Sequence, residues 1–223
     1  IDVRDPLPVG LNWGVARVRR RPTRPAPVEI TEDYFPERTE PTMKKAFVEF
    51  VAALRDAEFP AVDSLVMPSS FVLVPQAHRT IMAAEAAAYH GPRLARHPED
   101  YPPRITELIN EGLTVPAAEL ARATALHSQL FFEFTQRDIP AALITPAAPG
   151  PAPGTQTTGD AALNIPWSFL GMPTASIPFA RTADGMPLGL QIAGERFTED
   201  RVLTSAERLE TELGYEHRLP PVP

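Results

Sequence analysis

Two pairs of adjacent residues have side chains that could together perform nucleophilic catalysis, with serine as the nucleophile and lysine as the base. Ser69 and Ser70 form a doublet, and Lys44 and Lys45 are adjacent. A serine attacks a carbonyl only when a base takes its proton, and lysine acts as that base near neutral pH only when desolvated. The two lysines begin an amphipathic segment, so we expect them to face water. The doublet lies between proline and phenylalanine, where an oxyanion-binding loop needs glycines, so we expect a turn.

The histidines do not suggest a second kind of site. His78, Glu85 and His90 share one expected helix, but steps of seven and five residues do not place three metal ligands on one face. His127 and Ser128 are neighbours, and adjacent helical residues point about 100° apart, so they cannot share a proton. We therefore predict no catalytic residue, metal site or cofactor within this chain.

Motifs for several enzyme classes are absent: G-x-S-x-G, H-E-x-x-H, G-x-x-x-x-G-K-[ST] and G-x-G-x-x-G. The sequence has no cysteine, which excludes thiol catalysis, thiolate metal sites and disulfides, and fits a reducing, cytoplasmic location. No apolar run approaches the length of about 18 residues that a membrane helix requires, so we expect no membrane partner.

Composition indicates an ordinary globular protein that can build one sizeable core or two small ones. The 223 residues are 43% hydrophobic and 22% charged, and 27 prolines are spread along the chain. The formal net charge of −7 argues against nucleic acid as the main partner, because phosphate binding favours a basic surface.

The elements that must position any site begin with an expected connecting segment, residues 1–38, containing one strand at 11–18. Residues 39–145 are expected to be mainly helical, with short strands at 61–67 and 141–145. The first helix, 39–57, has one apolar face: Met43, Ala46, Phe47, Phe50, Val51 and Leu54.

Three further helices are expected between residues 75 and 137. The first covers 76–90 and stops at Gly91-Pro92, and the second covers 103–110 and stops near Gly112. The third follows Pro116 and continues to about residue 137. Its apolar stripe is Leu120, Ala123, His127, Leu130, Phe131 and Phe134.

Residues 146–223 are expected to form a loop, a β-hairpin and a terminal helix. Strands at 174–179 and 188–193 flank Asp184-Gly185, a strong hairpin signal. Thr198 is the expected N-cap of the last helix, and Gly214 its end. The buried stripe of this helix is expected to be Val202, Leu203, Ala206, Leu209 and Leu213.

Residues 157–194 read TTGDAALNIPWSFLGMPTASIPFARTADGMPLGLQIAG, an order of polar loop, Asn-Ile-Pro-Trp, Gly-Met-Pro, strand, turn and strand. This stretch resembles the C-terminal part of the amidase signature family, serine hydrolases that cleave carboxamides with a Ser-Ser-Lys triad. Residues 78–90, 97–101 and 120–153 resemble the family in the same order. The resemblance covers about residues 11–214.

The resemblance implies an α/β fold, a mixed β-sheet flanked by helices, of which residues 1–223 form the C-terminal portion of a single domain. Family members are usually much longer, and their nucleophile, second serine, lysine and oxyanion N–H groups lie upstream. The chain begins at Ile1 and not at a methionine, which fits a preceding portion. We therefore expect the missing N-terminal half, a partner chain or a homodimer to cover an exposed sheet edge.

The resemblance also suggests substrate-binding residues: Thr158, Asp160, Asn164 and Trp167. In glutamine-using relatives an acidic residue near the position of Asp160 reads the substrate's amino group. The alternative is structural: Asn164 and Thr158 tie the loop through side-chain hydrogen bonds, and Trp167 belongs to the core.

The implied function of the complete protein is hydrolysis of a small carboxamide to acid plus ammonia or amine, through a serine nucleophile. This chain alone is expected to be inactive. Two alternatives remain open at this point: a non-catalytic interaction subunit that retains the amidase scaffold, and an unrelated α/β binding protein.

Overall fold

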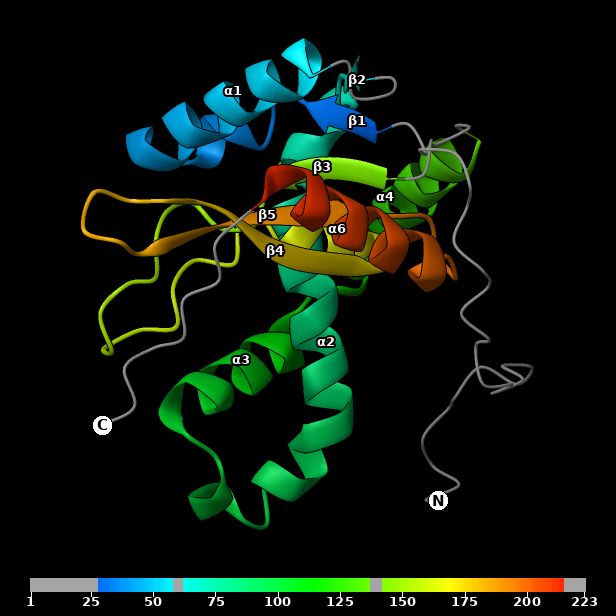
Figure 1. Cartoon of the computed structure of the whole chain (residues 1–223). Helices are drawn as coiled ribbons and strands as arrows, with labels where there is room; N and C mark the ends of the chain where they lie inside the picture. The colour runs from blue at the N-terminus through cyan, green and yellow to red at the C-terminus, as the bar shows by residue number, and fades with distance from the viewer. Residues whose placement is uncertain (1–27, 58–61, 137–141, 215–223) are drawn as a thin grey trace.

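The computed structural model describes residues 28–57, 62–136 and 142–214, and Figure 1 shows a twisted sheet with helices on both faces. The sheet has the strand order β2-β1-β3-β5-β4. Its strands are β1 (Val28–Thr31), β2 (Val62–Leu65), β3 (Ala142–Pro146), β4 (Thr174–Arg181) and β5 (Pro187–Ala193). β1 runs parallel to β2 and β3, whereas β5 runs antiparallel to β3 and β4. The mixed sheet predicted from the resemblance is confirmed.

The strands agree with the sequence predictions in all but one region. The strand predicted at 61–67 is β2, the one at 141–145 is β3, and Asp184-Gly185 lies in the turn between β4 and β5. The strand predicted at 11–18 lies outside the described residues. β1 itself was not predicted, because four residues are too few for alternation to distinguish a strand from a loop.

The helices form two layers on the sheet, apart from α3, which packs against α2. They are α1 (Pro41–Asp56), α2 (Val74–Leu94), α3 (Pro103–Thr114), α4 (Ala117–Thr135), α5 (Ile165–Leu170) and α6 (Glu199–Leu213). Short 3₁₀ turns occur at Pro36–Arg38, Ser69–Leu73 and Pro98–Asp100. α1 and α6 cover one face of the sheet, and α2, α4 and α5 cover the other. None of the helices in the described ranges is both long and apolar enough to cross a membrane.

The first helix lies where periodicity placed it. The predicted apolar face of α1 is buried except for Ala46, which is partly buried. Lys44 and Lys45 are exposed, as predicted, and Lys45 lies 3.8 Å from Glu49. The serine doublet is not a simple turn: Ser69 and Ser70 open a five-residue 3₁₀ helix that leads directly into α2.

Two predicted helix stops were wrong. α2 continues through Gly91-Pro92 to Leu94, because Pro92 removes only its own donor and the Ala95 N–H still bonds the Gly91 carbonyl at 3.0 Å. α3 continues through Gly112 to Thr114.

Gly112 marks a helix crossing. A Cβ at this position would lie 1.9 Å from the Ala83 carbonyl oxygen of α2 and 2.8 Å from the Ala87 Cβ. Only glycine allows the two backbones this approach, so the residue is required by packing between helices and not by the end of a helix.

The last helix, α6, departs from the prediction at two residues, Leu203 and Thr198. Leu203 of α6 is 61% exposed, although it was assigned to the buried stripe, because it points about 100° away from buried Val202. Thr198 occupies the N-cap position, but its hydroxyl donates to the Glu195 carbonyl at 2.7 Å and caps no helical N–H. Gly214 ends α6 in the left-handed region, φ +55°, as predicted.

The predicted stripe of α4 is buried at three of its six positions. Ala123, Leu130 and Phe134 are buried, and the other three residues are half-buried.

Candidate functional site

The carboxyl ends of the parallel strands β1 and β3 meet at one edge of the sheet. In open α/β sheets ligands bind outside this edge, because the loops that leave it are free to carry polar groups. The segment after β3, residues 147–164, extends from this side together with the hairpin turn between β4 and β5 (Figure 1). This edge is therefore the expected location of a ligand site.

Three polar residues form a row across the sheet at this edge. Thr31 ends β1, Thr145 lies beside it on β3, and Thr145 is the register partner of Gln191 on β5. Their side chains are 0%, 0% and 4% exposed. We call Thr31, Thr145 and Gln191 the polar row.

The polar row faces the layer formed by α2, α4 and α5. The preceding residues of β1 and β3, Ile30 and Ile144, pack into the opposite core with α1 and α6, and side chains alternate along a strand. Leu143 and Ala193, which flank the row on its own face, pack with α2, α4 and α5. The polar row is thus surrounded by apolar side chains.

The polar row holds unfilled hydrogen-bonding capacity. The hydroxyls of Thr31 and Thr145 and the Oε1 atom of Gln191 are buried without a partner among the described residues. Buried polar atoms are nearly always paired, and each unpaired one costs about 1–3 kcal/mol. Such groups are tolerated where they serve a purpose other than stability.

Asn164 connects the polar row to the surface. It occupies the N-cap position of α5, and its Oδ1 atom accepts a hydrogen bond of 2.8 Å from the Gln191 Nε2 atom. The Asn164 side chain is exposed. Because its oxygen is engaged by Gln191, its amide nitrogen remains as a donor directed at other groups.

Trp167 lies in the core below this edge. Its indole is 1% exposed and stacks on Phe35, with ring centres 4.9 Å apart and planes within 5°. The indole nitrogen is buried and unpaired within the described residues. The structural alternative for Trp167 thus describes its position well, and a direct contact with substrate stays a prediction.

Thr158 and Asp160 lie in the exposed part of the loop. The Asp160 carboxylate accepts the Ala162 N–H at 2.8 Å, an Asx turn that fixes the approach to α5. The Thr157 hydroxyl accepts the Gly159 N–H at 3.1 Å. Of the four predicted residues, Asn164 is the one that the described structure joins to the polar row by a hydrogen bond.

The start of the same loop is attached to α1. The Glu40 N–H donates to the Pro149 carbonyl at 2.7 Å. A Cβ at Gly150 would lie 2.5 Å from the Glu40 carboxylate, so glycine permits this close approach.

The segment after β1 adds further buried polar atoms. Asp33 accepts the Met67 N–H at 2.9 Å through one oxygen, while the other is buried and unpaired in the part of the chain that is described. Burial raises the pKa of Tyr34, whose ring is covered by the Arg38 guanidinium at 3.5 Å. The Tyr34 hydroxyl is also buried and, among described residues, unpaired.

Sequence reasoning missed the polar row, although a signal existed. Thr145 interrupts an otherwise apolar strand, and Gln191 does the same on β5. Their alignment depends on which strands become neighbours, and that information is absent from either segment alone.

Two histidines lie near α5 without forming a catalytic pair. His78 and His127 flank Phe169, with ring centres 6.5 Å and 5.2 Å away. Burial lowers the pKa of both imidazoles, and the Arg196 charge lowers that of His127 further. Ser128 donates to the Thr124 carbonyl at 3.1 Å, away from His127, in line with the prediction that these neighbours share no proton.

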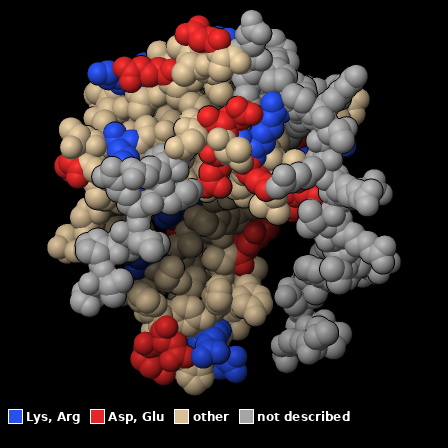
Figure 2. Space-filling view, viewed as in Figure 1, with Lys and Arg blue, Asp and Glu red and all other residues tan. Residues whose placement is uncertain are grey.

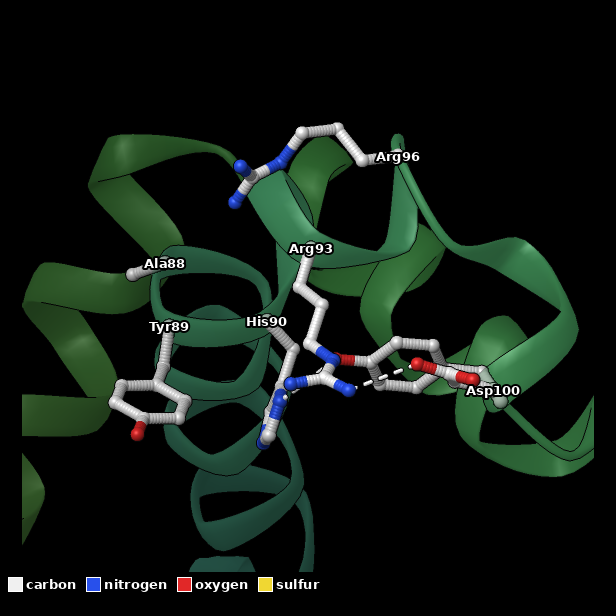
Figure 3. Close-up of a pocket in the computed structure, with 7 residues that line it drawn as sticks. Ala88, Tyr89, His90, Arg93, Arg96 and Asp100 are labelled. Carbon is white, nitrogen blue, oxygen red and sulfur yellow. Dashed lines mark hydrogen bonds and ion pairs between the residues drawn. The ribbon is translucent and has the colours of Figure 1, made fainter.

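A hollow of about 780 Å³ lies away from the sheet edge, on the arm formed by α2, the 3₁₀ turn at Pro98–Asp100, and α3. Figure 3 shows its polar side chains meeting one another: Arg93 binds Asp100 at 2.8 Å, and the His90 ring contacts the Tyr101 hydroxyl at 3.2 Å. Figure 2 shows acidic and basic side chains together at this lower end of the molecule. These contacts brace the turn against α2, and the described residues hold no group of three potential metal ligands.

The comparison with protein families decides the assignment. A model of the family described as Amidase matches residues 16–203. This chain belongs to the amidase family. Membership removes the unrelated α/β binding protein from consideration and confirms the resemblance to amidase signature enzymes.

Comparisons with individual proteins agree with membership of the amidase family. The chain is 27% identical to a glutamyl-tRNA(Gln) amidotransferase subunit from Sphingopyxis alaskensis, over 86% of this chain and 45% of the relative. It superimposes on a crystal structure of an amidase with a TM-score of 0.73 and 28% identity, over 84% of this chain and 46% of that one. It shares the fold of a glutamyl-tRNA(Gln) amidotransferase subunit from Thermotoga maritima, with a TM-score of 0.61 and 19% identity, over 83% of this chain and 42% of that one. The chain thus spans about half the length of the proteins it matches.

Proposed function

We propose that this chain forms one wall of the substrate site in an amidase that hydrolyses a small carboxamide to a carboxylic acid plus ammonia or an amine. The observation that carries the proposal is the polar row, with Asn164 hydrogen-bonded to its Gln191, at the carboxyl-end edge of an amidase-family sheet. The reactive serine, the bridging serine and the lysine are assigned to the portion of the domain upstream of this chain.

The geometry of Asn164 suits a carboxamide. Gln191 engages the Asn164 oxygen, which leaves the Asn164 amide nitrogen to donate to a substrate carbonyl. Thr158 and Asp160 are proposed to approach the same ligand from the loop, with the Asp160 carboxylate accepting from an amino group. Trp167 is proposed to support this site from the core, where it stacks on Phe35.

The reaction of the complete enzyme is acyl transfer. The activated serine attacks the amide carbon, the C–N bond breaks, and the amine leaves with a proton. Water then attacks the acyl-enzyme and releases the acid. The residues described here bind and orient the amide, and the attacking group is supplied from outside them.

No serine next to a competent base supports attack within the described residues. Ser64 donates to Glu32 at 2.5 Å, but this hydrogen bond, together with Arg55, lowers the pKa of Glu32. A carboxylate with a lowered pKa is a weaker base, and the group is exposed. Ser64 lies on β2, Glu32 follows β1 and Arg55 lies on α1, so the contact is better explained as a surface link among these three elements.

The covering partner is proposed to be the remaining half of the domain. In the described sheet β2 and β4 each have a neighbouring strand on one side only. Val66, Val72 and Leu73, which follow β2, are 72%, 59% and 55% exposed. A homodimer would cover the same surface, and sedimentation of the isolated chain distinguishes the two arrangements. A cytoplasmic location belongs to the same proposal.

A serine-reactive fluorophosphonate with intact-mass detection tests this assignment, together with ammonia release from a short aliphatic or aryl amide. The isolated chain is expected to give neither an adduct nor ammonia. The chain combined with an amidase N-terminal half that carries the Gly-Ser nucleophile loop and the lysine is expected to give both. Burst formation of an acyl-enzyme on the isolated chain would contradict the proposal.

The alternative is a non-catalytic interaction subunit that retains the scaffold. The absence of a serine–base pair among described residues is compatible with it. It predicts a stable complex with the N-terminal half in which neither adduct nor ammonia is detected.

A further inference from the structure

We propose that Arg196 is a positioning residue for this site, acting through α5. The inference rests on the proposed function, because the group that α5 presents to the ligand is Asn164. Arg196 itself lies at the opposite end of the helix and touches no part of the polar row.

The Arg196 side chain binds the backbone at the carboxyl end of α5. Its Nε atom donates to the Leu170 carbonyl, the last residue of α5, at 2.8 Å. Its guanidinium carbon lies 4.5 Å from the centre of the Phe131 ring on α4. A guanidinium over an aromatic face is attracted by the ring quadrupole, so Arg196 joins α5 to α4.

Gly171 allows this arrangement. The residue ends α5 with φ +64°, a conformation that glycine adopts without strain. A Cβ at this position would lie 2.3 Å from the Arg196 Nη2 atom. The planar guanidinium therefore lies directly against the glycine backbone, and both features require a residue without a side chain.

α5 is held at both ends by side chains from one segment. A helix of six residues has no stability of its own, because helix nucleation is unfavourable and its few hydrogen bonds do not offset it. Gln191 of β5 holds the amino end through Asn164, and Arg196, which follows β5, holds the carboxyl end.

The turn that carries Arg196 is itself closely packed. A Cβ at Gly194 would lie 2.5 Å from the Val202 side chain and 2.9 Å from the Thr198 hydroxyl. The position of Asn164 is thus fixed by the connection between β5 and α6. Loss of the second attachment is expected to let α5 rotate about the first.

The test uses Arg196→Met and Arg196→Lys. Methionine removes the hydrogen bond and the charge but keeps an unbranched chain, and lysine restores charge without the planar group. Arg181→Met is the matched control, because Arg181 donates to the Gly185 carbonyl at 3.0 Å in the distant hairpin turn.

Two readouts need no catalysis. Trp167 fluorescence, recorded in a Trp13→Phe background, reports the position of α5, and NMR titration reports the His127 imidazole. Arg196→Met is expected to shift Trp167 emission and to raise the His127 pKa, because the Arg196 charge lowers that pKa in the native protein. Arg181→Met is expected to change neither.

A kinetic readout is made on the enzyme assembled from both halves. Arg196→Met is expected to raise KM for the amide about tenfold while kcat changes less than twofold, because Asn164 binds substrate and does not react. Arg196→Lys should recover less than half of this loss. If a folded Arg196→Met variant keeps the wild-type KM, Arg196 has only a structural role; if Arg196→Met does not fold, the KM of Arg196→Lys decides.

The same experiments distinguish a failure of the proposed function from a failure of the inference about Arg196. An inactive assembled wild type with the expected Trp167 and His127 changes would overturn the amidase assignment and leave the two-ended attachment of α5 intact. Unchanged Trp167 emission in a folded Arg196→Met variant would overturn the attachment.

Discussion

Polar side chains are exposed and paired on the helical arm, whereas at the sheet edge they are buried and some of their atoms are unpaired. On the arm, Arg79 binds Glu111 and Arg93 binds Asp100, and all four side chains are at least 42% exposed. At the sheet edge, Thr145 and Gln191 are buried, and atoms of both lack partners among the described residues. Exposed ion pairs contribute little to stability, at most about 1 kcal/mol each, whereas unpaired buried groups cost more than that.

This difference indicates where the chain has been selected for something other than folding. On the arm, these charged groups find partners at the exposed surface, either across the contact between α2 and α3 or on the turn that follows α2. The edge keeps polar groups that an apolar residue of the same shape would replace with a gain in stability. Substitutions and pH changes in the two regions should therefore have effects of different size and sign.

The largest effect is expected at the helix crossing of the arm. Gly112→Leu should destabilise the chain by about 3 kcal/mol or more, because the new side chain would collide with the Ala83 backbone. Urea unfolding followed by circular dichroism measures the change. Gly91→Ala is the control: a Cβ there would meet only the Leu113 side chain at 3.8 Å, so stability should be unchanged or slightly higher.

Substitution in the polar row should act in the opposite direction. Thr145→Val is expected to stabilise the isolated chain by about 1 kcal/mol, because it removes an unpaired buried hydroxyl and preserves shape. Thr80→Val is the matched control, since its hydroxyl contacts Glu119 at 3.3 Å and its loss should not stabilise. Destabilisation by Thr145→Val would mean that the hydroxyl has a partner.

Stability should fall on mild acidification because of the histidines beside α5. Burial lowers the folded-state pKa of His78 and His127 below the ordinary value of 6.5, so the unfolded chain binds protons first. Their contribution is complete above pH 6.5 and is lost as the pH falls from 6.5 toward the lowered values. Thermal unfolding between pH 7.5 and 5 measures it, and a His78→Gln, His127→Gln double variant should show a flatter profile.

The smallest effect is expected for the ion pair of the arm. Arg93→Met should change stability less than the other substitutions, because the Arg93 and Asp100 side chains are 63% and 43% exposed and water screens them. Chemical unfolding at low and high salt measures this change. A loss as large as that expected for Gly112→Leu would show that the hollow in Figure 3 depends on this ion pair.

Some elements could be predicted because their signals are local. The apolar face of α1 follows from spacing alone, and the hairpin follows from Asp184-Gly185, where Gly185 adopts φ +87°. The amidase resemblance rests on residues 157–194, which contain that hairpin and α5. Asn164 was singled out by this resemblance, and the structure adds that Gln191 orients it.

Other features could not be predicted because they depend on distant segments. Gly112 reads as a helix stop until α2 is placed against it. Leu203 reads as apolar and therefore buried until the contact face of α6 is known. Arg196 carries no signal at all in the sequence, since it lies in a turn and its partners Leu170 and Phe131 lie on α5 and α4, far from it along the chain.

The amino-acid sequence by itself determined the family, the helical faces and the absence of cysteine chemistry, because short-range spacing and residue type carry that information. Only the tertiary structure decided that Thr31, Thr145 and Gln191 stand side by side, and that α5 is held at both ends. The reason is physical: strand register and helix packing join segments that are far apart along the chain, and burial gives a polar atom its cost only after those segments have met.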